Sequence, residues 1–451
     1  MQQNRAVKIE FKNFEENSTF RTIHYLGSKL RSLEFIKKTI DEIDPSKKGV
    51  CDLFSGSGVV SHYLSGERLI FCSDIQNYSK VICEALLNPI SNNFIDNFIP
   101  SLKRKEVIEI ELKKFKKIIN YENQILNGNI NNTDKICNFL EDCSIYNFIE
   151  EKNKKINKEL YKVLSETKKI LEKDKKKFII TKYYGGLFFS FKQSIVLDVI
   201  LNHINNLNEK YKNFLLASLL STASDLVNTV GKQFAQPIRP RDKNNKPKNG
   251  LLNQLKKDRN LDVIFYFEKW FSKYSNIKAR NKEHKIFRLD FKKTLEKIDE
   301  KIKIVYADPP YTRDHYSRFY HVLETISLFD SPIVSKTKIA GKIKNSRGMY
   351  RENRHQSDFC IRSKAPKTFE YLFDKVAKKN KILLLSYSPY DENKKSHPRV
   401  VTLNVLKKLA KKYFKFVEVR TLGKFTHNKL NKSSLHLNAL DEAEILIICK
   451  N

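Results

Sequence analysis

Residues 49–58, GVCDLFSGSG, and residues 68–75, RLIFCSDI, decide the fold of the N-terminal part of the chain. Each stretch contains a short apolar run that ends in turn-forming or polar residues, and a helix is expected after the first. Strands that alternate with helices predict an α/β fold with a mostly parallel, doubly wound sheet covered on both faces. The same alternation of expected strands and helices begins again at about residue 288, with the apolar runs KIKIVYADPPY, KILLLSYSPY, KKYFKFVEVRTL and EAEILIICK.

The chain is predicted to contain one α/β domain that is split in sequence by a helical insertion. Between about residues 100 and 177, apolar residues recur at helical spacing among many charges, which is typical of long, exposed, mainly basic helices. A solvated helical face accounts for most of these lysines. The expected limits are 1–90 for the first half of the domain, 91–287 for the inserted region and 288–451 for the second half.

The charge of the chain favours a polyanionic partner. Its 451 residues include 85 Lys and Arg against 51 Asp and Glu, which gives a formal net charge of +34. Such an excess is typical of proteins that bind nucleic acids. A codon bias toward lysine is the alternative source of the excess.

Other bulk features predict a cytoplasmic protein that does not enter a membrane. No apolar run approaches the roughly 18 residues of a membrane span. The first residues, MQQNRAVKIEFKNFEENSTF, show no signal-peptide core. The seven cysteines include no C-x-x-C pair, which indicates a reducing compartment and neither a disulfide framework nor a zinc site.

A glycine turn and a following acid predict a nucleoside-bearing cofactor. Gly56 and Gly58 follow the first apolar run, where residues without side chains let a ligand approach the start of a helix. Asp74 ends the next apolar run, at the place where an acid accepts the two hydroxyls of a ribose. The third glycine of the dinucleotide fingerprint is missing, which favours S-adenosylmethionine. A plain turn with a surface acid is the alternative.

The sequence ADPPY, residues 307–311, predicts a rigid turn at an edge of the sheet. Proline fixes its own φ and restricts the residue before it, so Asp308 and Pro309 are expected to be extended where the strand KIKIVYA ends. The Asp308 carboxylate and the Pro309 carbonyl then become fixed acceptors, and Tyr311 supplies a flat ring. This set suits the exocyclic amine of a base outside the duplex. The alternative is a strand that merely ends at a proline-rich turn.

Three blocks of the sequence resemble adenine-specific DNA methyltransferases of the DNA adenine methylase type, which include restriction–modification methylases. IHYLGSKLRSLEFI (residues 23–36) is similar to their N-terminal cofactor motif, although Tyr25 stands where relatives often have Trp. DLFSGSG (residues 52–58) resembles their cofactor loop, and ADPPY resembles their catalytic motif. The order of the blocks is similar to the alpha arrangement of that family, with the recognition region between the loop and the catalytic motif.

The resemblance implies a Rossmann-like methyltransferase sheet and transfer of a methyl group from S-adenosylmethionine to N6 of adenine in double-stranded DNA, by base flipping. It also implies the modification enzyme of a restriction–modification system, with a separate cognate restriction endonuclease as a further partner. We expect a monomer without a metal. The implied cofactor-binding residues are Tyr25, Lys29, Asp52, Phe54, Gly56, Gly58, Asp74 and Asp308. The implied catalytic residues are Asp308, Pro309, Pro310 and Tyr311.

Three other residues have open roles. Asp290 lies in FRLDFKKTL (residues 287–295), which resembles the acidic segment before the catalytic strand of this family, but it could equally cap a helix that begins at Lys292. For His315 and His321, a core or hydrogen-bonded role is favoured over that of a general base, because a methylated amine can lose its proton after the transfer.

A basic loop and the segment after the catalytic turn are the expected DNA contacts. The loop NTVGKQFAQPIRPRDKNNKPKNG (residues 228–250) mixes basic residues with prolines and asparagines, which suits phosphates or a groove. The expected DNA-binding residues are Lys232, Arg239, Arg241, Lys243, Arg313 and Arg318. The segment KYYGGLFF (residues 182–189) is interpreted as core aromatic residues around two glycines. Candidates for the base pocket are Ser386, Tyr387 and Tyr390.

Two other kinds of function compete with adenine methylation. The first is methylation of the cytosine exocyclic amine or of RNA, against which the alpha order and the N-terminal aromatic–lysine block count. The second is a basic DNA-binding protein without catalysis. That reading leaves the joint presence of the glycine turn, Asp74 and the ADPPY turn unexplained.

Overall fold

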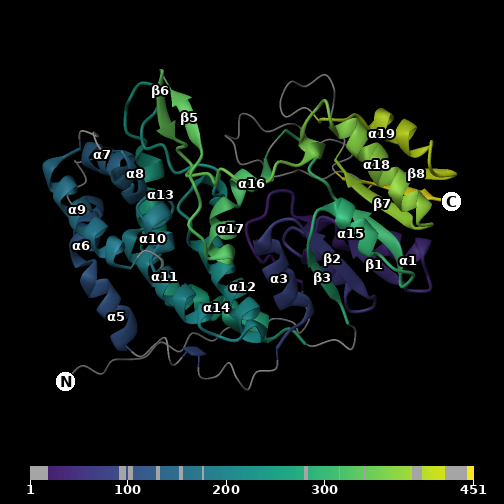
Figure 1. The fold of residues 1–451 in the computed structure, drawn as a ribbon, viewed down its shortest axis with the longest axis horizontal. Coiled ribbons are helices and arrows are strands. Elements are labelled where there is room, and N and C mark those ends of the chain that lie inside the picture. The colour runs from purple at the N-terminus through teal and green to yellow at the C-terminus, as the bar shows by residue number, and fades with distance from the viewer. Residues whose placement is uncertain are drawn as a thin grey trace.

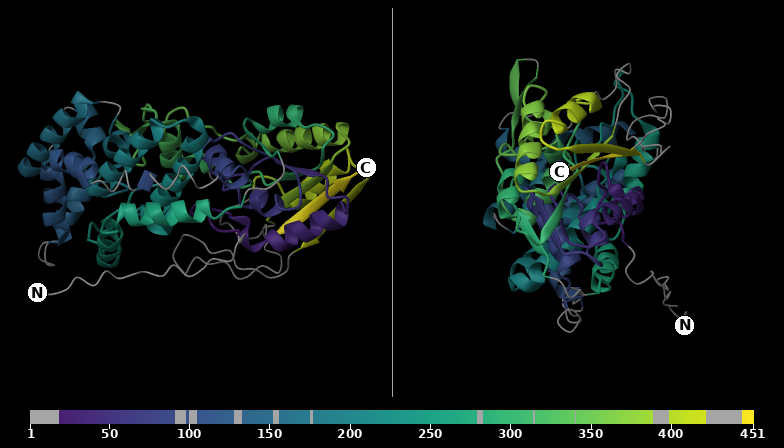
Figure 2. Two further views of the ribbon diagram at one scale, coloured as in Figure 1. Left: turned by 90° about the horizontal axis from the view of Figure 1, so that it is seen from below. Right: turned by 90° about the vertical axis from the view of Figure 1, so that its right-hand side faces the viewer.

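The computed structural model of the protein has an α/β half and a helical half, which lie side by side along the long axis of the molecule (Figure 1). Seen from below, the sheet and the helical half occupy opposite ends (Figure 2). The structure describes residues 19–90, 98–99, 105–127, 133–151, 156–174, 177–278, 283–313, 315–339, 341–388, 399–421 and 444–451.

Seven strands of these residues form one sheet, in the order β3-β2-β1-β4-β7-β9-β8. They are β1 (Gly49–Asp52), β2 (Ile70–Asp74), β3 (Lys285–Arg288), β4 (Ile302–Ala307), β7 (Ile382–Tyr387), β8 (Phe416–Thr421) and β9 (Ile445–Lys450). The first five of these run parallel, whereas β9 is antiparallel to both β7 and β8. The expected α/β class with a mainly parallel sheet is therefore confirmed. The first strand after the inserted region begins slightly earlier than the expected residue 288, because β3 begins at Lys285.

Helices cover both faces of the sheet. Neighbouring residues of a strand point to opposite faces, so each strand contributes to two separate apolar clusters. Val50 and Ile304 belong to one apolar cluster, and Cys51 and Val305 belong to the other. The helices of the first cluster next to the sheet are α1 (Leu33–Ile43), α2 (Val59–Leu64) and α3 (Asn77–Leu87). Those of the second are α15 (Phe291–Lys297), α18 (Ala365–Lys378) and α19 (Leu403–Ala410).

Between α3 and β3 the described residues form helices and no strand of the sheet. These are α5 (Lys105–Lys114), α6 (Lys116–Asn127), α7 (Thr133–Asp142), α8 (Ile145–Glu150), α9 (Lys158–Lys173), α10 (Ile179–Tyr184), α11 (Phe191–Asn205), α12 (Glu209–Leu226), α13 (Asn249–Arg259) and α14 (Val263–Ser275). Across the described ranges, no helix is both long and apolar enough to cross a membrane.

The helical half shares its main apolar core with the sheet. Helix α12 packs on α3 and α14, and all three contribute to the cluster that holds Val50 and Ile304. A second core, with Phe115, Leu164 and Leu255, joins α6, α7, α9 and α13 farther from the sheet. The domain limits at residues 90 and 287 thus stay predictions, since part of the inserted region packs as one body with the α/β half.

The aromatic segment with two glycines is a tight turn in the core, as expected. Gly186 adopts a φ of +76°, which favours glycine. The flanking aromatic residues are all buried: Tyr183, Tyr184, Phe188 and Phe189.

After β4, the chain crosses from the sheet to the helical half. Helices α16 (Tyr316–Phe319) and α17 (His321–Leu328) lead to a two-stranded hairpin of β5 (Lys336–Ile339) and β6 (Lys342–Asn345). In Figure 1, α16 lies between the hairpin and the sheet. Helix α17 packs on α3 and α12, so this crossing is anchored on the main core.

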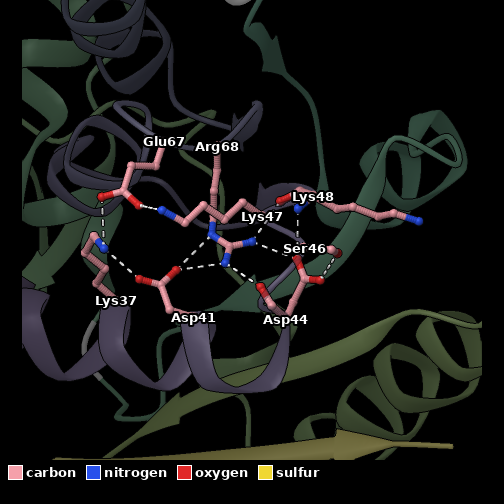
Figure 3. A network of polar contacts seen from close by, with 8 residues as sticks. All are labelled: Lys37, Asp41, Asp44, Ser46, Lys47, Lys48, Glu67 and Arg68. Carbon is pink, nitrogen blue, oxygen red and sulfur yellow. Dashed lines mark hydrogen bonds and ion pairs between the residues drawn. The ribbon is translucent and has the colours of Figure 1, made fainter.

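A buried arginine fixes the sheet at the edge where β1 and β2 begin (Figure 3). Arg68 is 1% exposed and its guanidinium donates to Asp44 Oδ2 at 2.7 Å and to Asp41 Oδ1 at 2.8 Å. It also donates to the carbonyls of Asp44 and Lys48, at 2.7 and 3.0 Å. Arg68 therefore holds the turn after α1 against the start of β2.

Candidate active site

The acids that end the parallel strands meet at one edge of the sheet. Asp52 ends β1, Asp74 ends β2, and Asp308 follows β4 directly. Parallel strands bring their carboxyl ends to the same edge, where ligands of α/β proteins bind. The strand order places these ends side by side, because β1 pairs with both β2 and β4.

The glycine turn is bonded to the acid that was expected to hold a ribose. Gly56 and Gly58 have φ values of +50° and +74°, and a Cβ at Gly56 would lie 2.5 Å from the Tyr25 hydroxyl. The Gly56 N–H donates to Asp74 Oδ2 at 3.0 Å, and the Gln76 N–H donates to Asp74 Oδ1 at 2.9 Å. Each carboxylate oxygen keeps a second lone pair for a ligand hydroxyl. Burial raises the pKa of Asp74, although both of these hydrogen bonds lower it.

One cavity joins the expected cofactor and catalytic residues. The expected residues that line it are Tyr25, Phe54, Asp74, Asp308, Pro309 and Pro310. Lys29, Asp52, Gly56, Gly58 and Tyr311 are not among its lining residues. Asp290 and His315 line it as well, together with a segment that the sequence did not single out, residues 355–358.

Asp308 forms an ion pair with the buried Lys29 at the start of the ADPPY turn. Lys29 Nζ lies 3.0 Å from Asp308 Oδ2 and 3.2 Å from Glu444 Oε1, and the Lys29 side chain is 5% exposed. The other oxygen, Asp308 Oδ1, is buried and has no hydrogen-bond partner in the described part of the chain. Buried polar atoms are normally paired, so this oxygen is an unused acceptor in a residue that lines the cavity.

The charges around Asp308 set its proton affinity. Burial raises the pKa of Asp308 to about 6, with Lys29 lowering it and Glu444 raising it. Burial alone would lower the pKa of Lys29, but Asp308 and Glu444 outweigh burial, and the pKa lies well above its usual value. Lys29 is therefore charged at neutral pH and lies between the side chains of two acids, Asp308 and Glu444.

Tyr311 presents its ring to two cations. Lys29 Nζ lies 5.9 Å from the ring centroid, and the Arg399 guanidinium carbon lies 4.7 Å from it. The Val400 N–H donates to the Tyr311 carbonyl at 3.1 Å, which fixes the backbone of the turn. The Tyr311 ring is thus already in contact with a flat, positively charged group, the Arg399 guanidinium.

Tyr25 packs in an aromatic group at the cavity wall. Its ring stacks on Tyr320 at 4.9 Å between centroids, with the planes 13° apart. The Tyr320 hydroxyl accepts the Leu26 N–H at 2.6 Å. Tyr25 is therefore held by its neighbours before any ligand binds.

Asp52 lies behind the cavity. Its Oδ2 accepts the Ser61 hydroxyl at 2.7 Å, and the residue is 2% exposed. Burial raises the pKa of Asp52 to about 7. These contacts join β1 to α2, and a role in cofactor binding stays a prediction.

The structure clarifies the surroundings of the three residues whose roles were left open, Asp290, His315 and His321. Asp290 caps α15, since its side chain accepts the Lys292 N–H at 2.9 Å, and it also lines the cavity. His321 is buried with Nε2 3.1 Å from the Phe234 carbonyl, and burial lowers its pKa to about 3. His321 is therefore a neutral core histidine, as favoured from the sequence. His315 lines the cavity, with Nε2 3.5 Å from Gln356 Nε2.

The expected DNA-binding residues fall into two groups. Lys232 pairs with Asp258 at 2.9 Å, and Arg241 pairs with Asp134 at 2.6 Å, so both charges are used within the protein. Whether either residue also reaches DNA stays a prediction. The exposed members without an ion pair in the described residues are Arg239, Lys243, Arg313 and Arg318.

Glu444 is the main site residue that the sequence did not reveal. It lies directly before β9, and because β9 is antiparallel, its first residues reach the edge where the parallel strands end. Ser386, at the end of β7, donates to Glu444 Oε1 at 2.5 Å. The Tyr387 hydroxyl donates to the Val401 carbonyl, and Tyr390 lies outside the described residues. In the described ranges, no group of His, Cys, Asp and Glu side chains is arranged to hold a metal ion.

Comparison with known proteins gives a consistent result. The family model "D12 class N6 adenine-specific DNA methyltransferase" matches residues 25–155 and 143–384. The chain is 25% identical over 440 residues to "Modification methylase LlaI" of Lactococcus lactis subsp. lactis, covering 95% of this chain and 55% of that protein. It is 23% identical over 380 residues to "Type II methyltransferase M.FokI" of Planomicrobium okeanokoites, covering 81% and 44%. The chain thus spans about half the length of these relatives.

Proposed function

Because the chain belongs to the D12 class of N6 adenine-specific DNA methyltransferases, we propose that it methylates N6 of adenine in double-stranded DNA. The proposed methyl donor is S-adenosylmethionine. The names of the two relatives support a modification enzyme of a restriction–modification system. A separate restriction endonuclease and a monomeric state remain part of the proposal.

The residues at the cavity fit this cofactor. Asp74 has free lone pairs for two ribose hydroxyls, and the absence of a side chain at Gly56 lets Tyr25, which lines the cavity, pack against the glycine turn. Tyr25 and Phe54 supply aromatic walls for an adenine ring or for the positively charged sulfonium group. When bound, S-adenosylmethionine supplies the electrophilic methyl group. The observations that support the proposal are the conformation of the glycine turn and its bond to Asp74.

Asp308 is the residue that carries the proposed chemistry. Its buried Oδ1 lacks a partner among the described residues, and Lys29 holds the other oxygen, so the carboxylate is fixed with one acceptor free. A hydrogen bond from the N6 amine to this oxygen draws the nitrogen lone pair out of conjugation with the ring. The amine nitrogen would then form the new N–C bond as the S–CH3 bond of the donor breaks, which leaves S-adenosylhomocysteine, and the methylated amine would release one proton to solvent.

The adenine has to leave the duplex to reach Asp308, because its N6 edge is paired inside the helix. Tyr311 is the proposed stacking ring for the flipped base, since it follows Asp308 by three residues and already packs against the flat Arg399 guanidinium. His315 lines the same cavity and is a further candidate for contact with the flipped nucleotide.

The direct test is methyl transfer by the wild type and by Asp308→Ala. With radiolabelled S-adenosylmethionine and genomic DNA, we expect label in N6-methyladenine after digestion to nucleosides. Asp308→Ala should reduce the rate by at least about 100-fold, the usual effect of losing a group that acts in the transition state, with DNA binding retained. Asp374→Ala is the matched control, because Asp374 is an α18 acid that pairs with Lys378. Label in cytosine or in RNA, or full activity of Asp308→Ala, would contradict the proposal.

A further inference from the structure

Two arginines lie against one tyrosine beside the cavity, and two more arginines lie close to this group. The guanidinium carbons of Arg318 and Arg354 lie 5.6 and 5.5 Å from the centroid of the Tyr350 ring. Arg347 donates to the Ile238 carbonyl at 2.8 Å, which places it beside Arg239. We call this group the Tyr350 cluster; its members are Tyr350, Arg239, Arg318, Arg347 and Arg354.

The arginines of the Tyr350 cluster carry positive charge that no paired carboxylate balances in the part of the chain that the structure describes. In the described ranges, none of its four arginines forms an ion pair with a carboxylate. Arg351, next in the chain to Tyr350, shows the contrast, since it binds both oxygens of Asp330 at 2.6 Å. Burial and then the charge of Arg239 lower the pKa of Arg347. Burial and then Arg318 likewise lower the pKa of Arg354. Like charges held together in this way favour an anionic ligand.

Two segments far apart in sequence hold the Tyr350 cluster in place. The Tyr350 hydroxyl donates to the Ala235 carbonyl, and the Phe234 N–H donates to the Phe319 carbonyl at 3.2 Å. Arg354 Nη1 donates to the Arg351 carbonyl at 3.0 Å. The arginines are therefore positioned by backbone contacts and by one ring, which leaves most of their N–H groups for a ligand.

The Tyr350 cluster lies at the rim of the candidate active site. Ser317 and His355 line the cavity, and they are the chain neighbours of Arg318 and Arg354. The contact between His315 and Gln356 joins the same two segments. An anion bound by the cluster would therefore lie next to whatever enters the cavity.

Positive charge continues from the Tyr350 cluster along the β5–β6 hairpin. The Ser335 N–H donates to the Tyr350 carbonyl at 2.7 Å, so the base of the hairpin begins at the cluster. The two strands carry four exposed lysines, Lys336, Lys338, Lys342 and Lys344. In Figure 1 the hairpin extends away from the sheet, which gives a basic surface longer than a single phosphate needs.

We propose that the Tyr350 cluster binds backbone phosphates of the DNA strand that carries the target adenine, next to the flipped nucleotide. This assignment rests on the proposed methylation of DNA. Planar guanidinium groups bind phosphate oxygens through two parallel N–H donors, and the Tyr350 ring keeps the guanidinium groups of Arg318 and Arg354 close to each other. Arg239 and Arg318 were expected to contact DNA, and the cluster adds Arg347, Arg354 and Tyr350.

The test measures DNA binding without a methyl donor, as the dependence of Kd on salt for mixed-sequence duplex DNA. The double variant Arg318→Gln/Arg354→Gln should raise Kd roughly 10- to 100-fold near 0.15 M salt and lower the slope of log Kd against log salt by about 2. Lys408→Gln/Lys411→Gln is the matched control, since it removes two exposed charges at α19. This control should leave Kd within about twofold of wild type and leave the slope unchanged.

A charge-conserving variant separates phosphate binding from a loss of folding. Arg318→Lys/Arg354→Lys should keep the salt slope while Kd rises by only a few-fold, because lysine keeps the charge but lacks the planar fork. All variants should melt within a few degrees of the wild type. A Kd and salt slope of the glutamine variant that match the control would overturn the assignment, as would a lysine variant no better than the glutamine variant.

The same preparations separate this proposal from the methylation on which it rests. If the wild type labels no adenine but the glutamine variant still loses DNA binding, the proposed function fails and the phosphate site stands. If the wild type methylates adenine and the glutamine variant binds DNA as the wild type does, the phosphate site fails and the proposed function stands.

Discussion

Replacing Glu444 by Gln should make the proposed methyl transfer less sensitive to acid. Glu444 is 3% exposed and shares Lys29 with Asp308. Glutamine keeps the size of the side chain and an oxygen that can accept from Lys29 and Ser386. The substitution therefore removes one negative charge with little change in packing. Asp308 acts as a carboxylate in the proposed reaction, so activity should rise as pH passes its pKa of about 6.

The size of the effect follows from the two distances to Lys29. The bonded oxygens of Asp308 and Glu444 lie at most 6.2 Å apart, the sum of 3.0 and 3.2 Å. Two unit charges at that separation repel by about 2.7 kcal/mol at an effective dielectric constant of about 20. The partial exposure of Asp308 reduces this repulsion. We expect the acid limb of the pH profile to move to lower pH by roughly one to two pH units.

The assay is the single-turnover rate of methyl transfer at saturating DNA and cofactor, from about pH 5 to pH 8.5. At the acid end Glu444→Gln should be faster than the wild type, and the two rates should converge at the alkaline end, where Asp308 is ionised in both. Glu418→Gln on β8 is the control, because Glu418 is exposed and pairs with Arg420. An acid limb at the same pH in both proteins would refute the reasoning.

Two further substitutions test other parts of the molecule. Asp74→Ala should weaken S-adenosylmethionine binding at least about tenfold by calorimetry, because it removes the ribose acceptor and the bond from Gly56. Equal affinities would remove Asp74 from the site. Arg68→Met should lower the free energy of unfolding by about 3–5 kcal/mol, since it leaves Asp44 as a buried carboxylate without its partner. Chemical denaturation measures this loss, and an unchanged midpoint would show that the contacts in Figure 3 add little.

Local sequence was enough to predict those site residues that lie next to a strand end. Asp74 and Asp308 each follow an apolar run, and parallel strands necessarily bring such ends together. The left-handed conformation of Gly56 and Gly58 follows from the same kind of local rule, because glycine adopts it without strain. The buried state of His321 and the aromatic turn at Gly186 were also readable from nearby residues.

Local sequence rules could not predict residues that reach the site through contacts between distant parts of the chain. The segment before Lys450 reads as a strand, but nothing in it shows that it lies antiparallel between β7 and β8. Glu444 reaches Lys29 only because of that placement. Tyr350 likewise meets Arg318 through a hairpin whose base is fixed by tertiary hydrogen bonds. Neither contact leaves a periodic pattern in the sequence.

The position of β9 also determines the order in which neighbouring strands of the sheet can pair during synthesis. β9 lies between β7 and β8 in the sheet, although it is the last of the three to leave the ribosome. Until residues 444–450 have emerged, β8 has no neighbour in this sheet and Lys29 lacks one of its two carboxylate partners. A nascent chain interrupted earlier would therefore contain the glycine turn and the turn at Asp308 without the contact between Lys29 and Glu444. Pairing of β9 with β7 and β8 thus joins β8 to the sheet and brings Glu444 to Lys29 in one step.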